Sequence, residues 1–480
     1  MNRILVGPFN RVEGDLELTL DIEAGRVAEA RVATPLYRGF EQILVGRPAA
    51  DALTVAPRIC GICSVSQSMA AAAMLRALTG VQPQPNGERA ANIAHAAENI
   101  ADHLTHFYLF FMPDFARSPY ARENWFPAVE ARFKAVSGAA APEVLPARAR
   151  LLHVMGLIAG KWPHSLAIQP GGVTRALDLG EKMRLLAILG DFRAFLERTL
   201  FAAPLEKVLA IATPAGLVEF SQGPGDFAAF LRLGQNLRLD LLGRSALPLL
   251  SFGAYHAAGG PLFAPGVFDP RQLERRPLPE NGVAEDVACS FFAENSTDPA
   301  LALTAPDAER KGAYSWAKAP RLGGEPAETG AAARQAVDGD ALVRALVAEQ
   351  GGTNVFVRVV ARLMEIARLT VAAEIWARAL RLDEAFCETP PEPVSGQVSG
   401  MVEAARGALG HWASVEKGVI QRYQIIAPTT WNFSPRDGAG APGPLEQALV
   451  GVEVGEAGAK APAIQHVVRS FDPCMVCTAH

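Results

Sequence analysis

The spacing of hydrophobic residues changes along the chain, and each change predicts a different kind of element. Leu16, Leu18 and Leu20 alternate with polar residues, which is the period of a half-buried strand. Residues 23–26 contain a glycine and predict a turn into a second strand. We therefore expect a small antiparallel sheet within residues 1–35.

Most of the remaining chain has helical spacing. Apolar residues recur every three or four positions in residues 88–112, 141–200 and 338–385. A further helix is predicted after Cys63, with Ser64 as its N-cap and Gly80 as its stop. Residues 204–335 are rich in proline and glycine and predict short strands and loops. The predicted class is mainly α (α+β), a bundle of long helices with a small N-terminal antiparallel sheet.

Composition narrows the functional class. The 480 residues are 50% hydrophobic, carry a formal net charge of −5 and contain no Lys/Arg-rich run, so no nucleic-acid partner is expected. The chain also has no run of about 18 apolar residues and no signal-peptide pattern at its start. We therefore expect no direct insertion into a membrane.

Two C-x-x-C pairs near the two ends of the chain are the main candidates for chemistry. They are Cys60, Cys63, Cys474 and Cys477. Four thiolates can converge on one thiophilic metal. Structural zinc remains an alternative, although such sites usually take both pairs from neighbouring hairpins. A redox pair fits less well because neither pair lies in a βαβ pattern, and Cys289 and Cys387 are expected to be apolar core residues.

Several polar residues have two interpretations. Glu13, taken alone, is typical of a surface carboxylate. His95, Asp102 and His106 form a polar stripe on the strongly apolar helix 88–112. Such a stripe is usually a solvated face, but on this helix buried polar groups are at least as plausible.

The stretches RICGIC (58–63) and DPCMVCTAH (472–480) resemble the two signatures of the nickel–iron hydrogenase large subunit. The resemblance runs from Glu13 to His480. It implies the fold of that family as one extended domain over residues 1–480. In this interpretation residues 1–35 form strands, residues 50–200 form the first metal-binding half, and residues 338–480 close the metal site.

The resemblance also implies cofactors. Nickel is expected on all four paired cysteines, with Cys63 and Cys477 also bridging to an iron that carries carbon monoxide and two cyanides. Pro428 and Thr429 are expected to contact these diatomic ligands.

A magnesium ion is implied as well. Its expected ligands are Glu41, His480 and the backbone carbonyl of Ile425, because magnesium prefers oxygen ligands and retained waters.

The implied reaction is heterolytic cleavage of dihydrogen. Two routes for the proton stay open. In one, Cys474 passes it to Glu13; in the other, Arg406 accepts it with Asp102 and Asp472 arranged around it. Family members commonly carry proline before this arginine, so Ala405 is expected to loosen the turn.

The chain has no cysteines left for iron–sulfur clusters, which need about four each. The implied partner is an iron–sulfur small subunit in an obligate heterodimer, alone or as a dimer of heterodimers. Maturation proteins are expected to supply the diatomic ligands.

Three features resemble the hydrogen-sensing (regulatory) branch of the family. Gln67 stands where most members have histidine, so an altered path for protons or electrons toward the partner is expected there. Ile62 and Phe110 match bulky residues of the gas channel. The chain also stops at His480, without the extension that most relatives carry. This predicts a cytoplasmic, slow hydrogenase that signals to a histidine kinase.

Two alternatives remain open. The first is an energy-conserving uptake hydrogenase that feeds a cytochrome or quinone and is exported with its partner. The second is a non-catalytic scaffold with structural zinc, against which the four retained cysteines argue.

Overall fold

The chain begins with the predicted antiparallel sheet. The computed structural model describes residues 2–257, 259–279, 282–392 and 394–480. Three strands pair in the order β1-β2-β3, and they are β1 (Asn2–Val6), β2 (Glu17–Glu23) and β3 (Arg26–Ala33). Leu16, Leu18 and Leu20 are fully buried, so the alternation indicated the core-facing side correctly.

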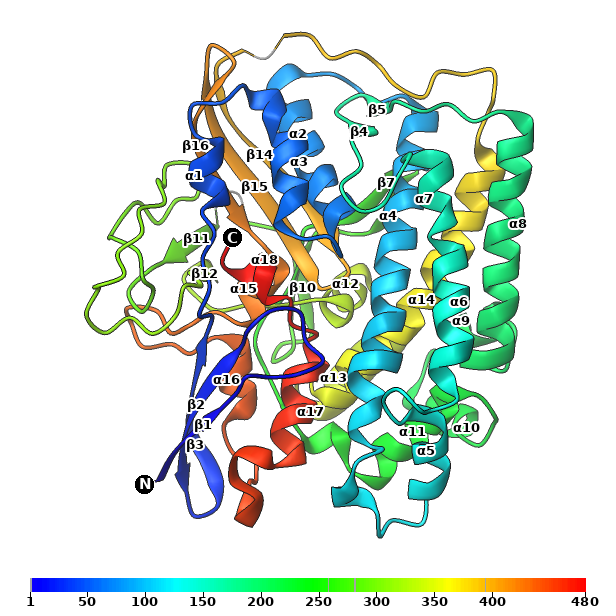
Figure 1. The fold of residues 1–480 in the computed structure, drawn as a ribbon, viewed down its shortest axis with the longest axis vertical. Coiled ribbons are helices and arrows are strands. Elements are labelled where there is room, and N and C mark those ends of the chain that lie inside the picture. Colours follow the sequence, from blue (N-terminus) through cyan, green and yellow to red (C-terminus); the bar gives the residue numbers. More distant parts are fainter. Residues whose placement is uncertain (1, 258, 280–281, 393) are drawn as a thin grey trace.

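Long helices form the bundle on the other side of the molecule (Figure 1). They are α4 (Pro85–Thr105), α6 (Ala140–Leu151), α7 (His153–Ile158), α8 (Leu179–Phe195) and α14 (Val355–Ala379). Helix α14 packs against α4 and α8, and α6 packs against α8. The apolar residues of α4 that predicted the helix, such as Ile93, Ile100 and Leu104, are buried. The structure confirms the predicted α+β class with a helix bundle.

Helix α3 (Ser64–Thr79) follows the first cysteine pair directly. Gly80 ends it in the left-handed conformation, with φ of 70°, as predicted. The predicted N-cap is wrong by one residue, because Cys63 is the flanking residue and Ser64 is the first helical one. The Ser64 hydroxyl donates instead to Glu98 of α4.

The region 204–335 differs from its prediction in its first part. Three short helices come before the strands, and they are α9 (Leu205–Leu209), α10 (Pro214–Phe220) and α11 (Asp226–Asn236). Prolines and glycines mark the ends of these helices and obscured their spacing. The strands that follow are β6 (Leu249–Ser251), β7 (Ala254–Ala257), β8 (Gly260–Phe263), β9 (Gly266–Asp269), β10 (Glu274–Arg276), β11 (Val283–Asp286), β12 (Ala319–Leu322) and β13 (Glu328–Thr329).

A second antiparallel sheet near the C-terminus was not predicted. Its strands are β14 (Gly396–Ala404), β15 (Gly407–Glu416) and β16 (Val419–Ile426), paired in that order. The first seven residues of β15 are buried, so its sequence shows no polar alternation. This sheet packs against α3 (Figure 1), which places it beside the first cysteine pair.

The other elements are short or connect these layers. The α-helices are α1 (Phe40–Leu44), α2 (Ala52–Val55), α5 (Phe126–Phe133), α12 (Ala331–Asp338), α13 (Ala341–Gln350), α15 (Pro428–Asn432), α16 (Pro444–Leu449), α17 (Pro462–Ser470) and α18 (Met475–Thr478). Strands β4 (Ile168–Gln169) and β5 (Gly172–Val173) form a small ribbon, and a π-helical turn (His106–Phe111) extends α4. Among the helices of the described residues, none has the length and hydropathy needed to cross a membrane. The division into segments 1–35, 50–200 and 338–480 of one domain stays a prediction.

Candidate metal centre

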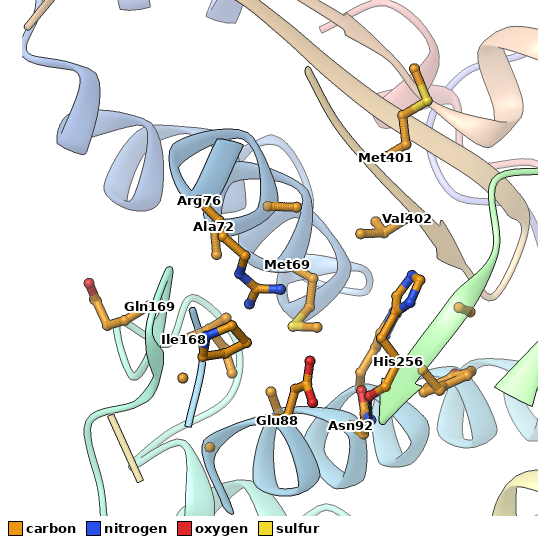
Figure 2. A pocket seen from close by; sticks show the side chains of 18 of the residues that line it. Met69, Ala72, Arg76, Glu88, Asn92, Ile168, Gln169, His256, Met401 and Val402 are labelled. Carbon is orange, nitrogen blue, oxygen red and sulfur yellow. Dashed lines mark hydrogen bonds between the residues drawn. The ribbon is translucent and has the colours of Figure 1, made fainter. Parts of the chain in front are cut away.

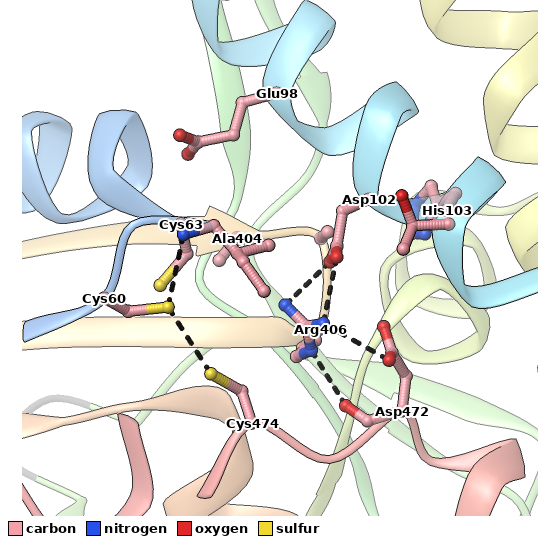
Figure 3. Close-up of polar contacts among 12 residues, drawn as sticks. Cys60, Cys63, Glu98, Asp102, His103, Ala404, Arg406, Asp472 and Cys474 are labelled. Carbon is pink, nitrogen blue, oxygen red and sulfur yellow. Dashed lines mark hydrogen bonds and ion pairs between the residues drawn. The ribbon is translucent and has the colours of Figure 1, made fainter. Parts of the chain in front are cut away.

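The four paired cysteines converge in the interior, and Figure 3 shows Cys60, Cys63 and Cys474 side by side. The Sγ atoms of Cys60 and Cys474 lie 3.6 Å apart, and those of Cys63 and Cys477 lie 3.2 Å apart. Cys474 and Cys477 are separated by 3.0 Å between sulfurs. All four are buried free thiols. The two ends of the chain therefore build one sulfur cluster.

The donor set fits a thiophilic metal ion. Metal–sulfur bonds of about 2.3 Å in a tetrahedron place the sulfurs about 3.8 Å apart. The observed distances of 3.6, 3.2 and 3.0 Å are shorter, so a bound ion would move the thiols slightly apart. Hydrogen bonds from the other three thiols hold the pKa of Cys60 well below its ordinary value, whereas the same contacts raise the pKa of Cys63 and of Cys477 well above it. Without a cation only part of the cluster ionises, so a bound metal would stabilise the fully ionised set.

Two segments hold the second cysteine pair in place. Met475 donates its backbone N–H to the carbonyl of Glu13 over 2.7 Å, which pairs the Glu13 segment with the chain end. The backbone N–H of Cys474 donates to the Thr429 hydroxyl of α15 at 3.2 Å. Glu13 and Thr429 are therefore both beside Cys474, where the resemblance implied them. Burial raises the pKa of Glu13, and the nearby Cys60 adds to the rise.

Arg406 lies between two aspartates near the cysteines (Figure 3). Its Nη1 is 2.8 Å from Asp102, its Nη2 is 3.2 Å from an Asp472 carboxylate oxygen, and its Nε donates to the Asp472 carbonyl at 2.9 Å. Burial raises the pKa of Asp102 to about 8, in spite of the opposing effect of Arg406. Burial is also the largest single effect on Asp472, but there Arg406, Arg362 and two nearby histidines together outweigh it and the pKa is lowered. The structure thus brings all three predicted residues together.

A second buried cluster surrounds Glu41 and the chain end. His480 Nε2 lies 3.4 Å from Glu41, and Lys318 Nζ lies 2.9 Å from the same carboxylate. Glu285 lines the same small cavity, and neither of its buried carboxylate oxygens has a hydrogen-bond partner among the described residues. These oxygen donors fit a hard divalent cation. The backbone N–H of Ile425 donates to the Glu41 carboxylate at 3.0 Å. The predicted role of the Ile425 carbonyl as a magnesium ligand stays a prediction.

Gln67 is buried one turn into α3 and joins this helix to the second sheet. His411 Nε2 lies 2.8 Å from the Gln67 amide oxygen, and the Tyr423 hydroxyl lies 2.8 Å from His411 Nδ1. Burial lowers the pKa of His411 to about 3, so the imidazole is neutral and links the two groups. Sequence analysis singled out Gln67 but not these two partners, because nothing in their spacing connects them.

The polar stripe of α4 is buried rather than solvated. Asp102 faces Arg406, His106 Nε2 lies 2.6 Å from the carbonyl of Arg469, and His95 Nε2 lies 3.1 Å from the Ser66 hydroxyl. The three residues therefore lie in three different environments, and of the three only Asp102 contacts Arg406.

A surface pocket of about 280 Å³ lies beyond His95, between α3, α4 and the second sheet (Figure 2). Arg76 and Glu88 lie at opposite sides of this pocket with their charged groups toward it. Of the residues predicted for the metal sites, none is among those that line it. The pocket is therefore separate from the cysteine cluster.

Glu98 is a buried acid of the centre that sequence analysis missed. Its carboxylate accepts the backbone N–H groups of Val65 and Ser66, both at 2.9 Å, and the indole N–H of Trp162 at 2.9 Å. It therefore satisfies the first turn of α3 from outside that helix. Burial raises the pKa of Glu98 to about 7. No sequence signal distinguishes it from the other acids of α4.

The two residues predicted to line a gas channel are both half-buried. Ile62 packs against the main core, and the Phe110 carbonyl accepts a hydrogen bond from Arg11 at 3.2 Å. Their role in a channel stays a prediction.

Comparisons with known proteins agree with this geometry. A family model described as nickel-dependent hydrogenase matches residues 38–122 and 142–480. The periplasmic [NiFeSe] hydrogenase large subunit of Desulfomicrobium baculatum is 27% identical, with 100% of this chain and 95% of the relative covered. The hydrogenase-2 large chain of Escherichia coli K12 is 26% identical, at 100% and 97% coverage. The quinone-reactive Ni/Fe-hydrogenase large chain of Wolinella succinogenes is 26% identical, at 100% and 96%.

Solved structures share the fold. The H2-activated [NiFeSe]-hydrogenase of Dm. baculatum matches with a TM-score of 0.85 and 26% identity, with both chains covered completely. The reduced Ni-Fe-Se hydrogenase of D. vulgaris Hildenborough matches with a TM-score of 0.84 and 28% identity, again over both complete chains. The predicted large-subunit fold is thereby confirmed. With a family match over most of its length and the sulfur cluster in place, this chain belongs to the nickel-dependent hydrogenases and is a hydrogenase large subunit.

Proposed function

We propose that this hydrogenase works as an uptake enzyme, which oxidises dihydrogen and passes the electrons to a cytochrome or quinone. The observation that carries the proposal is the buried sulfur cluster with Arg406 and Asp102 beside it. In it Cys60, Cys474 and Cys477 lie close enough together to share one ion, and Cys63 contacts Cys477. The relatives support the direction of the reaction and the acceptor, since one is named quinone-reactive and another periplasmic. The same names favour the uptake alternative over the sensing role that Gln67, Ile62 and Phe110 suggested.

Cys60, Cys63, Cys474 and Cys477 are the residues that would hold nickel. Cys63 and Cys477 would also bridge to an iron with one carbon monoxide and two cyanides. Such a group supplies the Lewis-acid centre at which dihydrogen is polarised and split. Pro428 and Thr429, at the start of α15, would lie against its diatomic ligands. The hydrogen bond between Thr429 and the Cys474 backbone supports this placement.

Glu13 would carry the proton away from the centre. Its segment is bonded to the Cys474 segment on both sides, through Pro473 and Met475. Burial raises its pKa, which brings the carboxylate nearer to the neutral range in which it can accept and release a proton.

Arg406 would act above the open side of the cluster. A guanidinium held between Asp102 and Asp472 is a fixed cation whose orientation costs nothing at the moment of reaction. Asp102 and Asp472 then keep the arginine side chain in place. Substitution of Glu13 decides between the route through Cys474 and Glu13 and the route on the Arg406 side, where Asp102 and Asp472 lie.

The second cluster would hold magnesium near the chain end. Glu41 and His480 are its proposed ligands. Glu285, whose carboxylate has an ion pair with Lys318 at 3.8 Å but no hydrogen bond among the described residues, lines the same cavity. A cation there would tie His480, and with it Cys477, to the Glu41 helix. This explains how a chain end of nine residues can be held firmly enough to supply two of the cysteines.

The electrons would leave through an iron–sulfur small subunit. The names of the relatives as large chains support such a partner. A histidine kinase and the cytoplasmic location belong to the sensing role, and fractionation of the host cells tests the location. Maturation proteins would install the diatomic ligands.

The test is an infrared spectrum of the protein purified with its small subunit from its own host. Bands from iron-bound carbon monoxide and cyanide that change under dihydrogen are expected. A folded, metal-loaded sample without such bands would contradict the nickel–iron centre and favour structural zinc.

Turnover separates the two catalytic roles. An uptake enzyme is expected to reduce a quinone analogue at a rate typical of metabolic enzymes, about 10 s⁻¹ or more. A rate orders of magnitude lower, together with a location in the cytoplasm, would support the sensor instead.

A further inference from the structure

The turn that carries Arg406 is held by contacts from outside its own hairpin. Strand β14 ends at Ala404 and pairs there with Gly407 of β15, which leaves Ala405 and Arg406 as a two-residue loop. Two-residue hairpin loops usually need positive φ angles at their central residues. Neither Ala405 nor Arg406 has a positive φ. Gly407, directly after the loop, takes a positive φ, but the two loop residues themselves offer no local restraint on their shape.

One external contact comes from the backbone before α12. Gly407 has a φ of 132°, and a Cβ built on it would meet Thr329 Oγ1 at 2.3 Å and the Gly330 nitrogen at 2.6 Å. The loop thus lies directly against the segment that leads into α12, with no room for a side chain between them.

The second contact is Arg334 of α12. Its guanidinium donates to the carbonyl of Ala404 at 2.8 Å and to the carbonyl of Ala405 at 3.0 Å. Both carbonyls belong to the turn itself. Arg334 is only 1% exposed, so these bonds form without competition from water.

Two carboxylates fix Arg334 in turn. Glu365 of α14 accepts from its Nε at 3.1 Å and from its Nη2 at 2.6 Å, and Glu403 accepts from its Nη1 at 2.7 Å. With the two carbonyls, these bonds use all five N–H groups of the side chain. A planar fork with every donor engaged has one orientation, which an ammonium group cannot reproduce.

We propose that Arg334 is a positioning residue of the metal centre, which fixes the carbonyls of Ala404 and Ala405 so that Arg406 stays aimed between Asp102 and Asp472. The proposal rests on the role given to Arg406 in the proposed function. Ala405 was expected to loosen this turn, and Arg334 supplies the restraint that alanine lacks. Arg334 does not touch the cysteines and takes no part in the chemistry itself.

Three variants of the heterodimer, purified with its metals, test the proposal. R334K keeps a positive charge between Glu365 and Glu403 but cannot bond both carbonyls. R321K is the matched control, because Arg321 is also buried and bonds one carboxylate, that of Asp437, and several carbonyls far from this turn. The third variant adds A405P to R334K, since proline at this turn position fixes φ near −65° and restrains the loop by another route.

In R334K we expect kcat to fall about tenfold or more while KM for dihydrogen changes less than about twofold, because the cation is misplaced but the cluster stays open to the gas. Amide hydrogen exchange in residues 401–412 should be faster, with nickel content and Tm close to those of R321K. A405P should recover part of the lost kcat and slow the exchange.

Two results would overturn the proposal. One is a kcat for R334K as close to wild type as that of R321K. The other is a loss of kcat with unchanged exchange in residues 401–412 and no recovery by A405P, which would make Arg334 a general stabiliser. If R334K does not accumulate, E403Q takes its place. We expect a smaller fall in kcat and a smaller increase of amide exchange in residues 401–412. Exchange at the wild-type rate in E403Q would contradict the proposal. The exchange measurement needs no turnover, so it is informative even if the infrared test of the proposed function fails.

Discussion

At the scale of single residues, Glu13 is the strongest test of the proton route. Its carbonyl accepts the N–H of Met475, which fixes the Glu13 segment beside Cys474. In E13Q the amide is nearly isosteric but cannot take up a proton, so we expect kcat to fall by about 10²-fold or more if the proton leaves this way. The infrared bands and their response to dihydrogen should persist, because binding and splitting do not need the carboxylate. Steady-state oxidation of dihydrogen measures the first effect and infrared spectroscopy the second.

The control for E13Q is D15N. Asp15 is two positions away and exposed, and its replacement should leave kcat within about twofold of wild type, as is usual for surface sites. A turnover of E13Q equal to that of D15N would exclude Glu13 and leave the route on the Arg406 side, with Asp102 and Asp472 around it.

Glu98 makes a prediction about pH. Burial raises its pKa from 4.5 to about 7 in the folded protein, so the folded state holds this proton more tightly than the unfolded chain. Stability should therefore fall as pH rises from about 4.5 to 7, by about 3 kcal/mol from this residue. The glutamine in E98Q cannot titrate, so this variant should lack the part of the pH dependence of stability that comes from Glu98. Thermal unfolding of both proteins between pH 5 and 8 measures the difference.

Comparing how the stabilities of wild type and E98Q change with pH separates the effect of Glu98 from that of the other acids. E98Q loses an acceptor for the Val65 N–H and is expected to be less stable than wild type at pH 5. The gap between the two proteins should narrow toward pH 8. If the stabilities of the two proteins change in parallel with pH, the Glu98 carboxylate stays ionised throughout. Its hydrogen bonds, from Ser64, Val65, Ser66 and Trp162, would then outweigh the effect of burial on its pKa.

At the scale of elements, the contact between α3 and β14 decides where Cys63 lies. A Cβ built on Gly400 of β14 would meet the Ala70 carbonyl at 2.2 Å and the Met74 nitrogen at 2.3 Å, both backbone atoms of α3. G400A must therefore push the strand away from the helix, at a cost of about 1–3 kcal/mol or more. We expect a lower Tm and a reduced nickel content, measured by calorimetry and elemental analysis.

G396A is the matched control on the same strand. A Cβ at Gly396 would have only an ordinary contact, with a Leu78 methyl group at 3.4 Å. Its stability should stay within about 0.5 kcal/mol of wild type. Equal behaviour of the two variants would show that α3 and β14 can separate without cost to the metal site.

The elements also show what a sequence can predict about this fold. Helices such as α4 and α14 carry apolar residues at helical spacing along their length, so this period identifies them. Strand β15 is buried along most of its length and therefore has no alternation to detect. Arg334 and His411 were not recognised for a related reason, because their partners lie in other elements. Side chains that act through tertiary contacts leave no local pattern.

At the scale of the whole molecule, each cysteine pair is recognisable by its spacing, but their meeting is not. Cys60 and Cys474 are 414 positions apart, and nothing between them specifies the convergence locally. The resemblance to a family supplied that step in advance. In the structure the Glu13 segment and α15 hold the chain end, and this places the second cysteine pair against the first pair at the start of α3.

This arrangement predicts what removal of the metal does. The chain end makes few backbone contacts of its own beyond Glu13 and α15, so the metal should account for much of its order. In metal-free protein we expect amide exchange in residues 472–480 to be faster by about tenfold or more, while the core of α14 exchanges as before. C477S should show the same pattern even when nickel is supplied. C289S, which alters a half-buried thiol outside the cluster, should not. Slow exchange of the chain end in both metal-free protein and C477S would mean that packing alone closes the site, and that the cluster is preformed before any metal enters.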